Sequence, residues 1–393
     1  MPSLGRGREV GKVKKVAFVA PTYPVLSETF IQTEVDSLKE CGHDVCVMTF
    51  KIESNEKSFD YDIVKIGQNI RVGKITHINW LGFVKAFSFV SRQNSMPKPS
   101  LFAYGFKLAL QLAERDIDHV HAHFCQHTAA HAIVAAKLLN ITCSFVAHGH
   151  DVYESPYDIE QKISSSDFVV AVCKDMLNDF NSMTKGNVKL LHCGVNTKQF
   201  QMQPKHDAKL MRLIFLGRLV EQKGVHHLIN ALAPIAQPLN IHLDIIGTGD
   251  LESQLKMQVE LQKLTRNVTF HGAQAHEWVK KNLSNYDGLV APFCFSKIGC
   301  VDTGPVVLKE AMAVGVPVIT TNIMGCKEIV TPETGFLVHA GNVGELQEII
   351  EHFAQLSSDE RGEMGIRARA RVETEFNSIK QAQQLSNWIE NTA

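Results

Sequence analysis

The second half of the 393-residue chain places basic side chains just after an apolar run, where they could bind an anionic ligand. Arg218 and Lys223 follow the run Leu213–Leu216, which has the length and composition of a buried strand. Ligands of a parallel sheet bind beyond the carboxyl ends of the strands, so both cations are placed to neutralise a diphosphate. Two solvated charges on a loop are an equally good interpretation of these residues taken alone.

A second group starts at Asp302 and runs into a helical pattern that ends at Gly315. Pro305 is suited to the first helical position, and the amino terminus of that helix would offer free N–H groups and partial positive charge to a phosphate. Glu310, a turn and a half into the helix, could accept hydrogen bonds from two ribose hydroxyls; an ordinary surface glutamate is the alternative. The residues expected around this amino terminus are Thr303, Gly304, Pro305, Val306 and Val307.

Two other turns of the second half carry weaker signals. Gly247 and Gly249 form a G-x-G after the run His242–Ile246, which alone indicates a tight turn more readily than a ligand site. Glu328 follows Gly325 and could either cap the site or begin a helix, and the structural role is favoured.

The first half offers polar residues at comparable strand ends. Ser27, Glu28 and Thr29 follow the buried run Val16–Ala20 and its Pro-containing turn. Glu28 could hydrogen-bond acceptor hydroxyls or could only favour the dipole of the helix expected from about residue 28 to 41. His148 follows the run Ser144–Ala147 and precedes Gly149, which permits close approach of a ligand; a loop histidine satisfied by backbone is the alternative.

Further polar residues of the first half are His123, which shares one strand face with His121, and Asp151. We expect His121 and His123 to help build the cleft wall. These histidines and His150 could suggest a metal, but no carboxylate stands at a supporting spacing, so no metal site is predicted.

Apolar runs alternate with helical patterns along the whole chain, which predicts an α/β protein with parallel sheets covered by helices. The polar segment 201–212 is interpreted as a linker, which gives a first domain over 1–204, with 1–14 as a tail, and a second over 205–375. The segment 376–393 is expected to be a helix docked on the first domain. Its apolar stripe comprises Phe376, Ile379, Ala382, Leu385, Trp388 and Ile389.

The composition excludes several classes of protein. A net charge of −1 with 21% charged residues argues against a nucleic-acid binder. Nine cysteines without a C-x-x-C pair fit neither a zinc site nor a disulfide framework and favour a reducing compartment. The first apolar run is too short for a signal peptide or membrane span, so a cytoplasmic location is expected.

The segment 63–113 is unusual because it holds seven Lys or Arg residues and no Asp or Glu. A helical face within it would carry Trp80, Leu81, Phe83, Val84, Phe87 and Val90, with Lys85, Ser88 and Arg92 opposite. This pattern is typical of an interfacial helix on anionic lipid at the inner face of the cytoplasmic membrane, and a core-packing helix with a solvated basic side is the alternative.

Taken together, these motifs resemble the retaining glycosyltransferases of group 1 and family 4, which have the GT-B fold of two facing Rossmann-like domains with a cleft between them. The resemblance is carried by Gly217-Arg-Leu-x-x-x-Lys-Gly, by the G-x-G, by the acid-x7-Glu spacing of Asp302 and Glu310, and by Gly325-x-x-Glu-Ile-Val, in this order. Tyr23-Pro-Val-Leu-Ser-Glu-Thr-Phe and His121-Ala-His-Phe resemble the exopolysaccharide (colanic-acid type) subgroup.

The resemblance implies transfer of a sugar from a nucleoside diphosphate to a hydroxyl of a saccharide or polyprenyl-diphosphate-linked acceptor, with retention and without a cofactor or metal. Arg218 and Lys223 would bind the diphosphate and Glu310 the ribose, while His148, with Asp151 close by, would stand nearest the reacting sugar. Asp302, in place of the usual glutamate, would contact the donor sugar.

Three other functions compete with this one. A dehydrogenase would need G-x-G-x-x-G after the first strand, where Pro21-Thr-Tyr stands, and is rejected. An epimerase of the same fold would lack the Arg–Lys and acid-x7-Glu pairs together. A catalytically weak sugar-nucleotide binder remains open because of Asp302.

Overall fold

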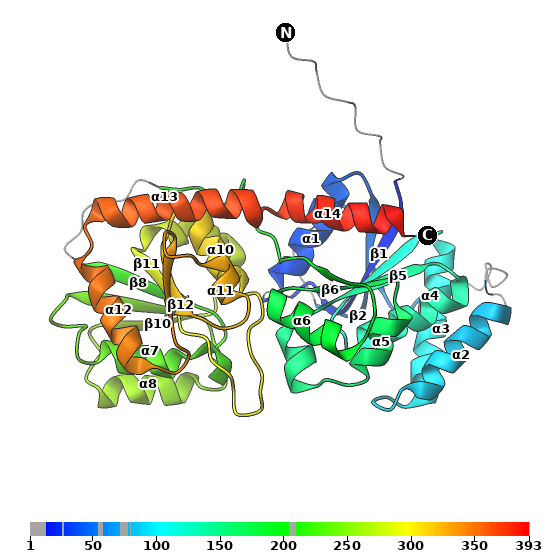
Figure 1. Ribbon diagram of the computed structural model, residues 1–393, viewed down its shortest axis with the longest axis horizontal. Coiled ribbons are helices and arrows are strands. Elements are labelled where there is room, and N and C mark those ends of the chain that lie inside the picture. The colour runs from blue at the N-terminus through cyan, green and yellow to red at the C-terminus, as the bar shows by residue number, and fades with distance from the viewer. Residues whose placement is uncertain are drawn as a thin grey trace, which may run out of the picture.

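Two lobes lie side by side, and each is built on one parallel sheet with helices packed against it (Figure 1). The computed structural model describes residues 13–25, 27–53, 58–70, 78, 80–203 and 210–392. The predicted tail 1–14 therefore lies almost entirely outside the described residues, and half of the predicted linker, residues 204–209, lies outside them as well.

The sheet of the first lobe has the order β3-β2-β1-β4-β5-β6-β7, and every neighbouring pair is parallel. Its central strand β1 is fully buried from Val16 to Ala20, as expected for a strand covered on both faces. The strands are β1 (Lys15–Tyr23), β2 (Asp44–Ile52), β3 (Ile63–Lys65), β4 (His119–His123), β5 (Thr142–Ala147), β6 (Phe168–Ala171) and β7 (Val188–Leu190).

The helices of the first lobe lie in the connections between these strands, except between β2 and β3, where the described residues form no helix. They are α1 (Thr29–Glu40), α2 (Trp80–Arg92), α3 (Lys98–Glu114), α4 (His127–Leu139), the single π-helical turn η2 (His150–Glu154), α5 (Ile159–Ser165) and α6 (Lys174–Met183).

The second lobe repeats the architecture with the strand order β10-β9-β8-β11-β12-β13, again all parallel. Its strands are β8 (Met211–Leu216), β9 (Ile241–Ile246), β10 (Val268–Gly272), β11 (Gly288–Ala291), β12 (Val318–Thr321) and β13 (Gly335–Val338). Its helices are η3 (Glu221–Lys223), α7 (Val225–Leu232), α8 (Glu252–Leu261), α9 (His276–Asn282), η4 (Leu283–Asn285), α10 (Val306–Ala313), α11 (Cys326–Ile329) and α12 (Val343–Gln355).

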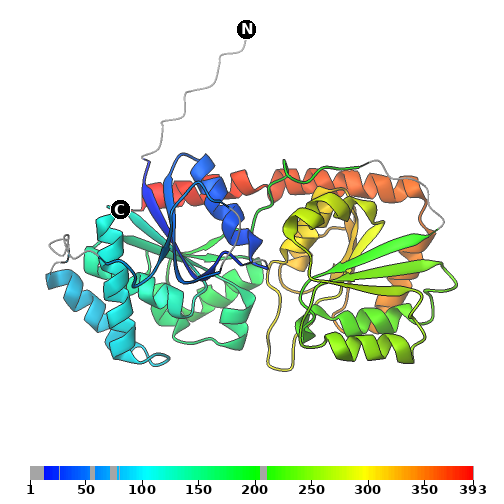
Figure 2. The same ribbon diagram turned by 180° about the vertical axis from the view of Figure 1, so that it is seen from behind.

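Two consecutive helices, α13 (Ser358–Glu375) and α14 (Ser378–Asn391), run along one edge of both lobes, as both views show (Figures 1 and 2). The predicted docking of the terminal helix on the first lobe is thereby confirmed. Leu385 and Ile389 are fully buried, Trp388 meets Phe168 edge-on at 6.0 Å, and Ser386 Oγ lies 2.8 Å from His43 Nε2.

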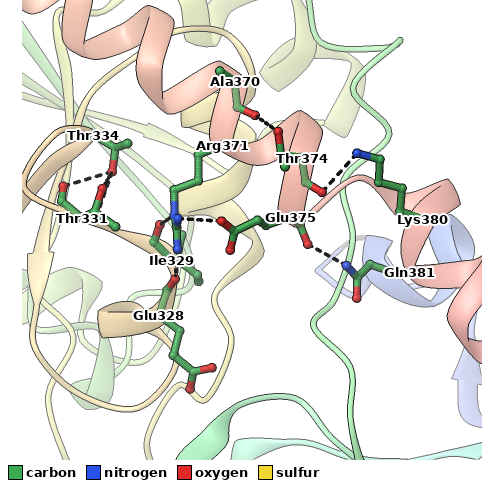
Figure 3. A network of polar contacts seen from close by, with 10 residues as sticks. All are labelled: Glu328, Ile329, Thr331, Thr334, Ala370, Arg371, Thr374, Glu375, Lys380 and Gln381. Atoms are coloured by element: carbon green, nitrogen blue, oxygen red, sulfur yellow. Dashed lines mark hydrogen bonds and ion pairs between the residues drawn. The ribbon is translucent and has the colours of Figure 1, made fainter.

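The joint between α13 and α14 is held by side chains that satisfy free backbone carbonyls (Figure 3). Arg371 donates to the carbonyls of Glu328 and Ile329 and pairs with Glu375. Lys380 and Gln381 of α14 donate to the carbonyls that end α13. Beside the joint, Val195 and Asn377 form a parallel bridge, so the two chain segments that join the lobes touch each other.

Three expectations need correction. Met211 and Arg212, assigned to the linker, already belong to β8, because Met211 packs in the core of the second lobe. Pro305 precedes α10 as its extended N-cap instead of being its first helical residue. Val90 faces the core with Phe89, so the exposed apolar face of α2 is smaller than predicted.

Candidate active site

A cavity of about 580 Å³ lies between the lobes, and the carboxyl ends of strands from both sheets open into it. Glu28 and His148 enter from the first lobe, after β1 and β5 respectively, and Arg218 and Gly247 enter from the second, after β8 and β9. The predicted residues that line the cavity are Ser27, Glu28, Thr29, His148, Arg218, Lys223, Gly247, Asp302, Thr303, Gly304, Pro305, Val306, Val307 and Glu310.

Lys223 and Asp302 form an ion pair on the wall of the second lobe, with Nζ 2.8 Å from Oδ1. Both side chains are largely buried, and the ammonium also lies 5.0 Å from the centre of the Phe293 ring. The pair fixes the position of the cation before any ligand binds. Arg218 stands nearby with an exposed side chain, so its charge is available at the mouth of the lobe.

The helix α10 directs its amino terminus into the cavity, where Val306 and Val307 are lining residues. The N-cap residue Pro305 makes no side-chain hydrogen bond to this end, so among the described residues the first N–H groups of the helix stay available to an anion. Further along α10, Glu310 is 7% exposed, and its Oε1 lies 2.9 Å from His276 Nε2. His276 thus holds the carboxylate in one orientation at the cavity wall.

On the opposite wall, the His148 ring packs between Phe30 and Phe124, at 4.7 and 4.8 Å between ring centres. Burial, assisted by the neighbouring His123, lowers the pKa of His148 to about 3. The imidazole is therefore neutral near pH 7. Gly149 approaches the second lobe so closely that a Cβ there would lie 2.0 Å from the Val301 carbonyl oxygen, which explains why glycine stands at this position.

Glu28 is the most perturbed acid of the cavity. Burial raises the pKa of Glu28 to about 7, and the Arg218 charge across the cleft only partly opposes that rise. Its Oε2 is buried and has no hydrogen-bond partner among the described residues. A carboxyl of this kind gains from any ligand hydroxyl that donates to it.

Glu28→Gln should stabilise the protein at pH 8 and have little effect at pH 5. Because the folded-state pKa of Glu28 is raised, its contribution to stability is fully present below about pH 4.5 and is lost as pH rises through 7. The shift corresponds to about 1–3 kcal/mol in the free energy of unfolding. Chemical denaturation at both pH values measures it, with Glu53→Gln, an exposed acid of the same cavity, as the control. Equal stability of wild type and Glu28→Gln at pH 8 would show that Glu28 ionises without cost.

Three predicted residues lie outside the cavity. Asp151 is fully buried and accepts hydrogen bonds from the backbone N–H groups of Cys125 and His148, so it holds the His148 loop instead of facing a ligand. His123 lies behind His148, with the two rings stacked at 5.8 Å, and with His121 it is enclosed in the core instead of building the cleft wall. Gly249 packs against the backbone of Leu219, where a Cβ would lie 2.5 Å from the carbonyl oxygen.

Glu328 joins the two lobes, in line with the favoured structural role. Its carboxylate accepts hydrogen bonds from the backbone N–H of Lys174 at 2.6 Å and from His192 Nε2 at 3.0 Å, both in the first lobe. Burial raises the pKa of Glu328, but these partners outweigh it and the net shift is downward.

Several residues that line the cavity were not predicted. Some of them directly follow a strand, so the rule that ligands bind beyond the carboxyl ends of parallel strands would have found them. Glu53 follows β2, and Gln274 and His276 follow β10. Phe30 and Phe124 end the two motifs of the first half that carry the resemblance, but no role in the site was predicted for either of them. Two Asp-x-Asp tripeptides, 60–62 and 116–118, could suggest a metal–diphosphate site, but neither lines the cavity.

Both halves of the chain match families of known proteins. Residues 27–199 match the profile described as Glycosyltransferase Family 4, and residues 196–371 match that of Glycosyl transferases group 1. The putative colanic acid biosynthesis glycosyltransferase WcaL of Escherichia coli (strain K12) is 24% identical over 92% of this chain and 96% of its own length. The amylovoran biosynthesis glycosyltransferase AmsK of Erwinia amylovora is 25% identical over 96% of this chain and 100% of its own.

Among solved structures, Anabaena HepE in complex with UDP and glucose superposes with a TM-score of 0.69 at 17% identity, over 95% of this chain and 98% of HepE. This similarity shows the fold, which is GT-B. Because the two family profiles together span residues 27–371 and the lobes have the matching architecture, the chain belongs to the group 1 and family 4 glycosyltransferases.

Proposed function

We propose that the protein transfers a sugar, with retention of configuration, from a nucleoside diphosphate to a hydroxyl of a saccharide or lipid-linked acceptor during synthesis of an exopolysaccharide, capsule or lipopolysaccharide. The observation that carries this proposal is the gathering of Arg218, Lys223, the uncapped end of α10 and Glu310 across one cavity from His148. The names of WcaL and AmsK support the polysaccharide setting, and the UDP bound to HepE supports the donor class.

On the donor side, the diphosphate would bind to Arg218, Lys223 and the amino terminus of α10. Lys223 would turn from Asp302 toward the phosphate, which leaves Asp302 free to accept hydroxyls of the donor sugar. The leaving diphosphate gains negative charge as the glycosidic bond breaks, and fixed positive groups in a water-poor cavity stabilise that charge. Glu310, oriented by His276, would bind the ribose.

On the acceptor side, Glu28 is placed to accept a hydrogen bond from the attacking hydroxyl. A pKa of about 7 lets this carboxyl exchange a proton near neutral pH. His148 is neutral and can offer the donor sugar a hydrogen bond without adding positive charge to the site. Attack from the face that the diphosphate leaves would give retention.

The test combines a binding screen with a product analysis. Thermal shift against UDP- and GDP-sugars identifies the donor, because a ligand that binds only the folded state raises its stability. If the nucleoside diphosphate is released only when an acceptor is added, sugar transfer is demonstrated. The coupling of the anomeric proton in the product gives the configuration of the new bond. Stabilisation by a donor without acceptor-dependent release under any acceptor tried would contradict transferase activity.

That outcome would favour the second candidate, a weakly active sugar-nucleotide binder, which the shorter acid at 302 motivates. Asp302→Glu separates the two functions. In an active transferase this change should alter the preference among donor sugars, whereas in a binder it should create acceptor-dependent release that the wild type lacks.

Transfer should not need a divalent cation at the diphosphate, because Arg218, Lys223 and the α10 terminus supply the positive charge there. The initial rate should be the same in buffer without added divalent ions and with Mg²⁺ or Mn²⁺. Dependence of the rate on either ion would show that a metal bridges the phosphates.

A lipid-linked acceptor is supported by the exposed part of α2. Trp80 is 80% exposed and Phe87 62% exposed, while Gly82 on the other side packs against α4. Lys85 and Arg92 are exposed on the same helix, whereas Arg71 and Lys74 of the basic segment lie outside the described residues. No helix among the described residues is long and apolar enough to cross a membrane. This helix is therefore suited to rest on an anionic bilayer, the inner face of the cytoplasmic membrane in our proposal.

Lys85→Glu with Arg92→Glu should abolish co-sedimentation with anionic liposomes at low salt. Each cation near an anionic surface contributes about 1 kcal/mol, and reversing two of them replaces attraction with repulsion. The matched control is Lys263→Glu with Arg266→Glu, two exposed cations of the second lobe, which should still bind. If wild type ignores anionic liposomes at low salt, the exposed face of α2 has another role.

A further inference from the structure

Three buried ligand atoms converge behind the cavity wall, at a place that the proposed transfer does not use. Glu34 of α1 points Oε1 at β4, where it lies 3.2 Å from His121 Nε2 and 3.4 Å from His123 Nε2. His121 is 1% exposed and His123 is fully buried. The carboxylate comes from a helix some 90 residues before the histidines, so sequence spacing could not associate them.

None of the three atoms has a hydrogen-bond partner among the described residues, although they lie within ion-pair distance of one another. Buried polar atoms of a folded protein are normally satisfied, and each one left alone is costly. The three atoms lie within 4.8 Å of one another, and each belongs to a residue type that binds metal ions.

The hydroxyl chain beside β4 fixes which nitrogen of His121 carries the proton. Thr142 Oγ1 donates to the Asp118 carbonyl, so it must accept from His119 Nδ1. His119 is buried between two hydroxyls with no carboxylate, which makes it neutral, so its Nε2 accepts from Ser144 Oγ at 2.7 Å. Ser144 then accepts from His121 Nδ1–H, also at 2.7 Å. The Nε2 atom of His121 takes no part in this chain of hydroxyls and faces Glu34 Oε1.

Two imidazole nitrogens and a carboxylate oxygen are a set of ligands that zinc prefers in proteins. Tetrahedral Zn²⁺ binds such atoms at about 2.0–2.2 Å, which places them about 3.3–3.5 Å apart. The observed separations of Glu34 Oε1 from the two imidazole nitrogens are close to that spacing. A hydrogen-bond partner on the other ring nitrogen orients a metal-bound imidazole. His121 has the Ser144 hydroxyl in this position, whereas His123 Nδ1 has no partner among the described residues.

We propose that Glu34, His121 and His123 bind a Zn²⁺ ion. The ion would clip α1 to β4 and so fix two neighbours of the cavity, the α1 start that carries Glu28 and the His123 ring that stacks on His148. This inference does not depend on the donor or the acceptor, since the site is separate from the diphosphate wall.

Metal analysis of the full-length protein tests it directly. Protein purified without chelator and without a histidine tag should contain about one equivalent of Zn²⁺, as a three-ligand site with one open position would hold. Glu34→Gln and His123→Asn should each lose the metal. His339→Ala, which removes an exposed histidine–carboxylate pair, should keep it.

Cobalt substitution of the wild type provides a readout that does not depend on variant folding. Co²⁺ in the proposed site has only nitrogen and oxygen ligands, so visible d–d bands should appear without a thiolate-to-metal band. A second cluster, His150, Glu154 and Cys300, would give that thiolate band and would lose its metal in Cys300→Ser. Absence of metal together with failure to bind added Zn²⁺ or Co²⁺ would overturn the proposal, as would metal lost in Cys300→Ser but retained in Glu34→Gln. In those cases the two imidazoles simply pair with Glu34.

Discussion

Replacing Arg218 or Lys223 by alanine should lower kcat/KM for the sugar-nucleotide donor by about 30- to 1000-fold, which corresponds to about 2–4 kcal/mol of transition-state stabilisation. The charge on the leaving diphosphate is largest in the transition state, so a lost cation affects kcat as well as KM. Lys223→Ala has an additional effect, since it leaves the half-buried Asp302 carboxylate without its partner at 2.8 Å. Steady-state kinetics with the donor found by thermal shift measures both variants.

The control for charge alone is Lys256→Ala, which removes an exposed lysine of α8 paired with Glu252. That variant should retain wild-type kinetics, because exposed pairs of this kind contribute little and the residue does not line the cavity. If both cavity variants also keep wild-type kcat/KM, the diphosphate does not bind on this wall and the donor site lies elsewhere.

Deleting the chain after Glu375 should give an aggregating protein with no cooperative unfolding transition. The deletion removes Phe376, Leu385 and Ile389, three large side chains with at most 1% exposure. Their burial is worth about 1.5–3 kcal/mol each, a total comparable with the whole stability of a typical domain. It also uncovers the apolar surface of the first lobe beneath α14, which promotes association. Expression yield, size-exclusion chromatography and thermal melting measure the outcome.

Two point variants of α14 test whether the truncated protein is unstable because the buried side chains are lost or because the chain is shorter. Leu385→Asp places a charge at a fully buried position and should reproduce most of the effect of the deletion. Asn387→Asp adds the same charge at an exposed position of the same helix and should melt like the wild type. A soluble truncation with an unchanged Tm would show that α14 is not needed to complete the first lobe.

The alternation of strands and helices was predictable because both sheets are parallel and covered on both faces. Such strands are continuous apolar runs, which stand out in a sequence, as Val16–Ala20 does. The edge strand β3 was not predicted, because three half-buried residues carry no such pattern. The one-residue shift at Pro305 has a local cause, since its ψ of 118° is extended although its φ of −60° fits a helix.

Within the site, residues directly after strand ends were predictable and residues that depend on tertiary contacts were not. Arg218 and His148 each come after a strand, so their position at the cavity follows from the rule that ligands bind beyond the carboxyl ends of parallel strands. The family resemblance placed Asp151 close to the reacting sugar with His148, yet its carboxylate turns inward to two backbone N–H groups. Glu34 shows the reverse case, since only the packing of α1 on β4 brings it to the histidines.

The bridge between Val195 and Asn377 bears on how the two lobes can move. Both segments that pass between the lobes are attached to each other there, so the lobes would pivot about this one region when they move relative to each other. The Glu328 contacts to Lys174 and His192 would have to break as the cleft opens. Opening would also move Glu28 away from Arg218, so the acidity of that carboxyl and the fit of the substrates would change together.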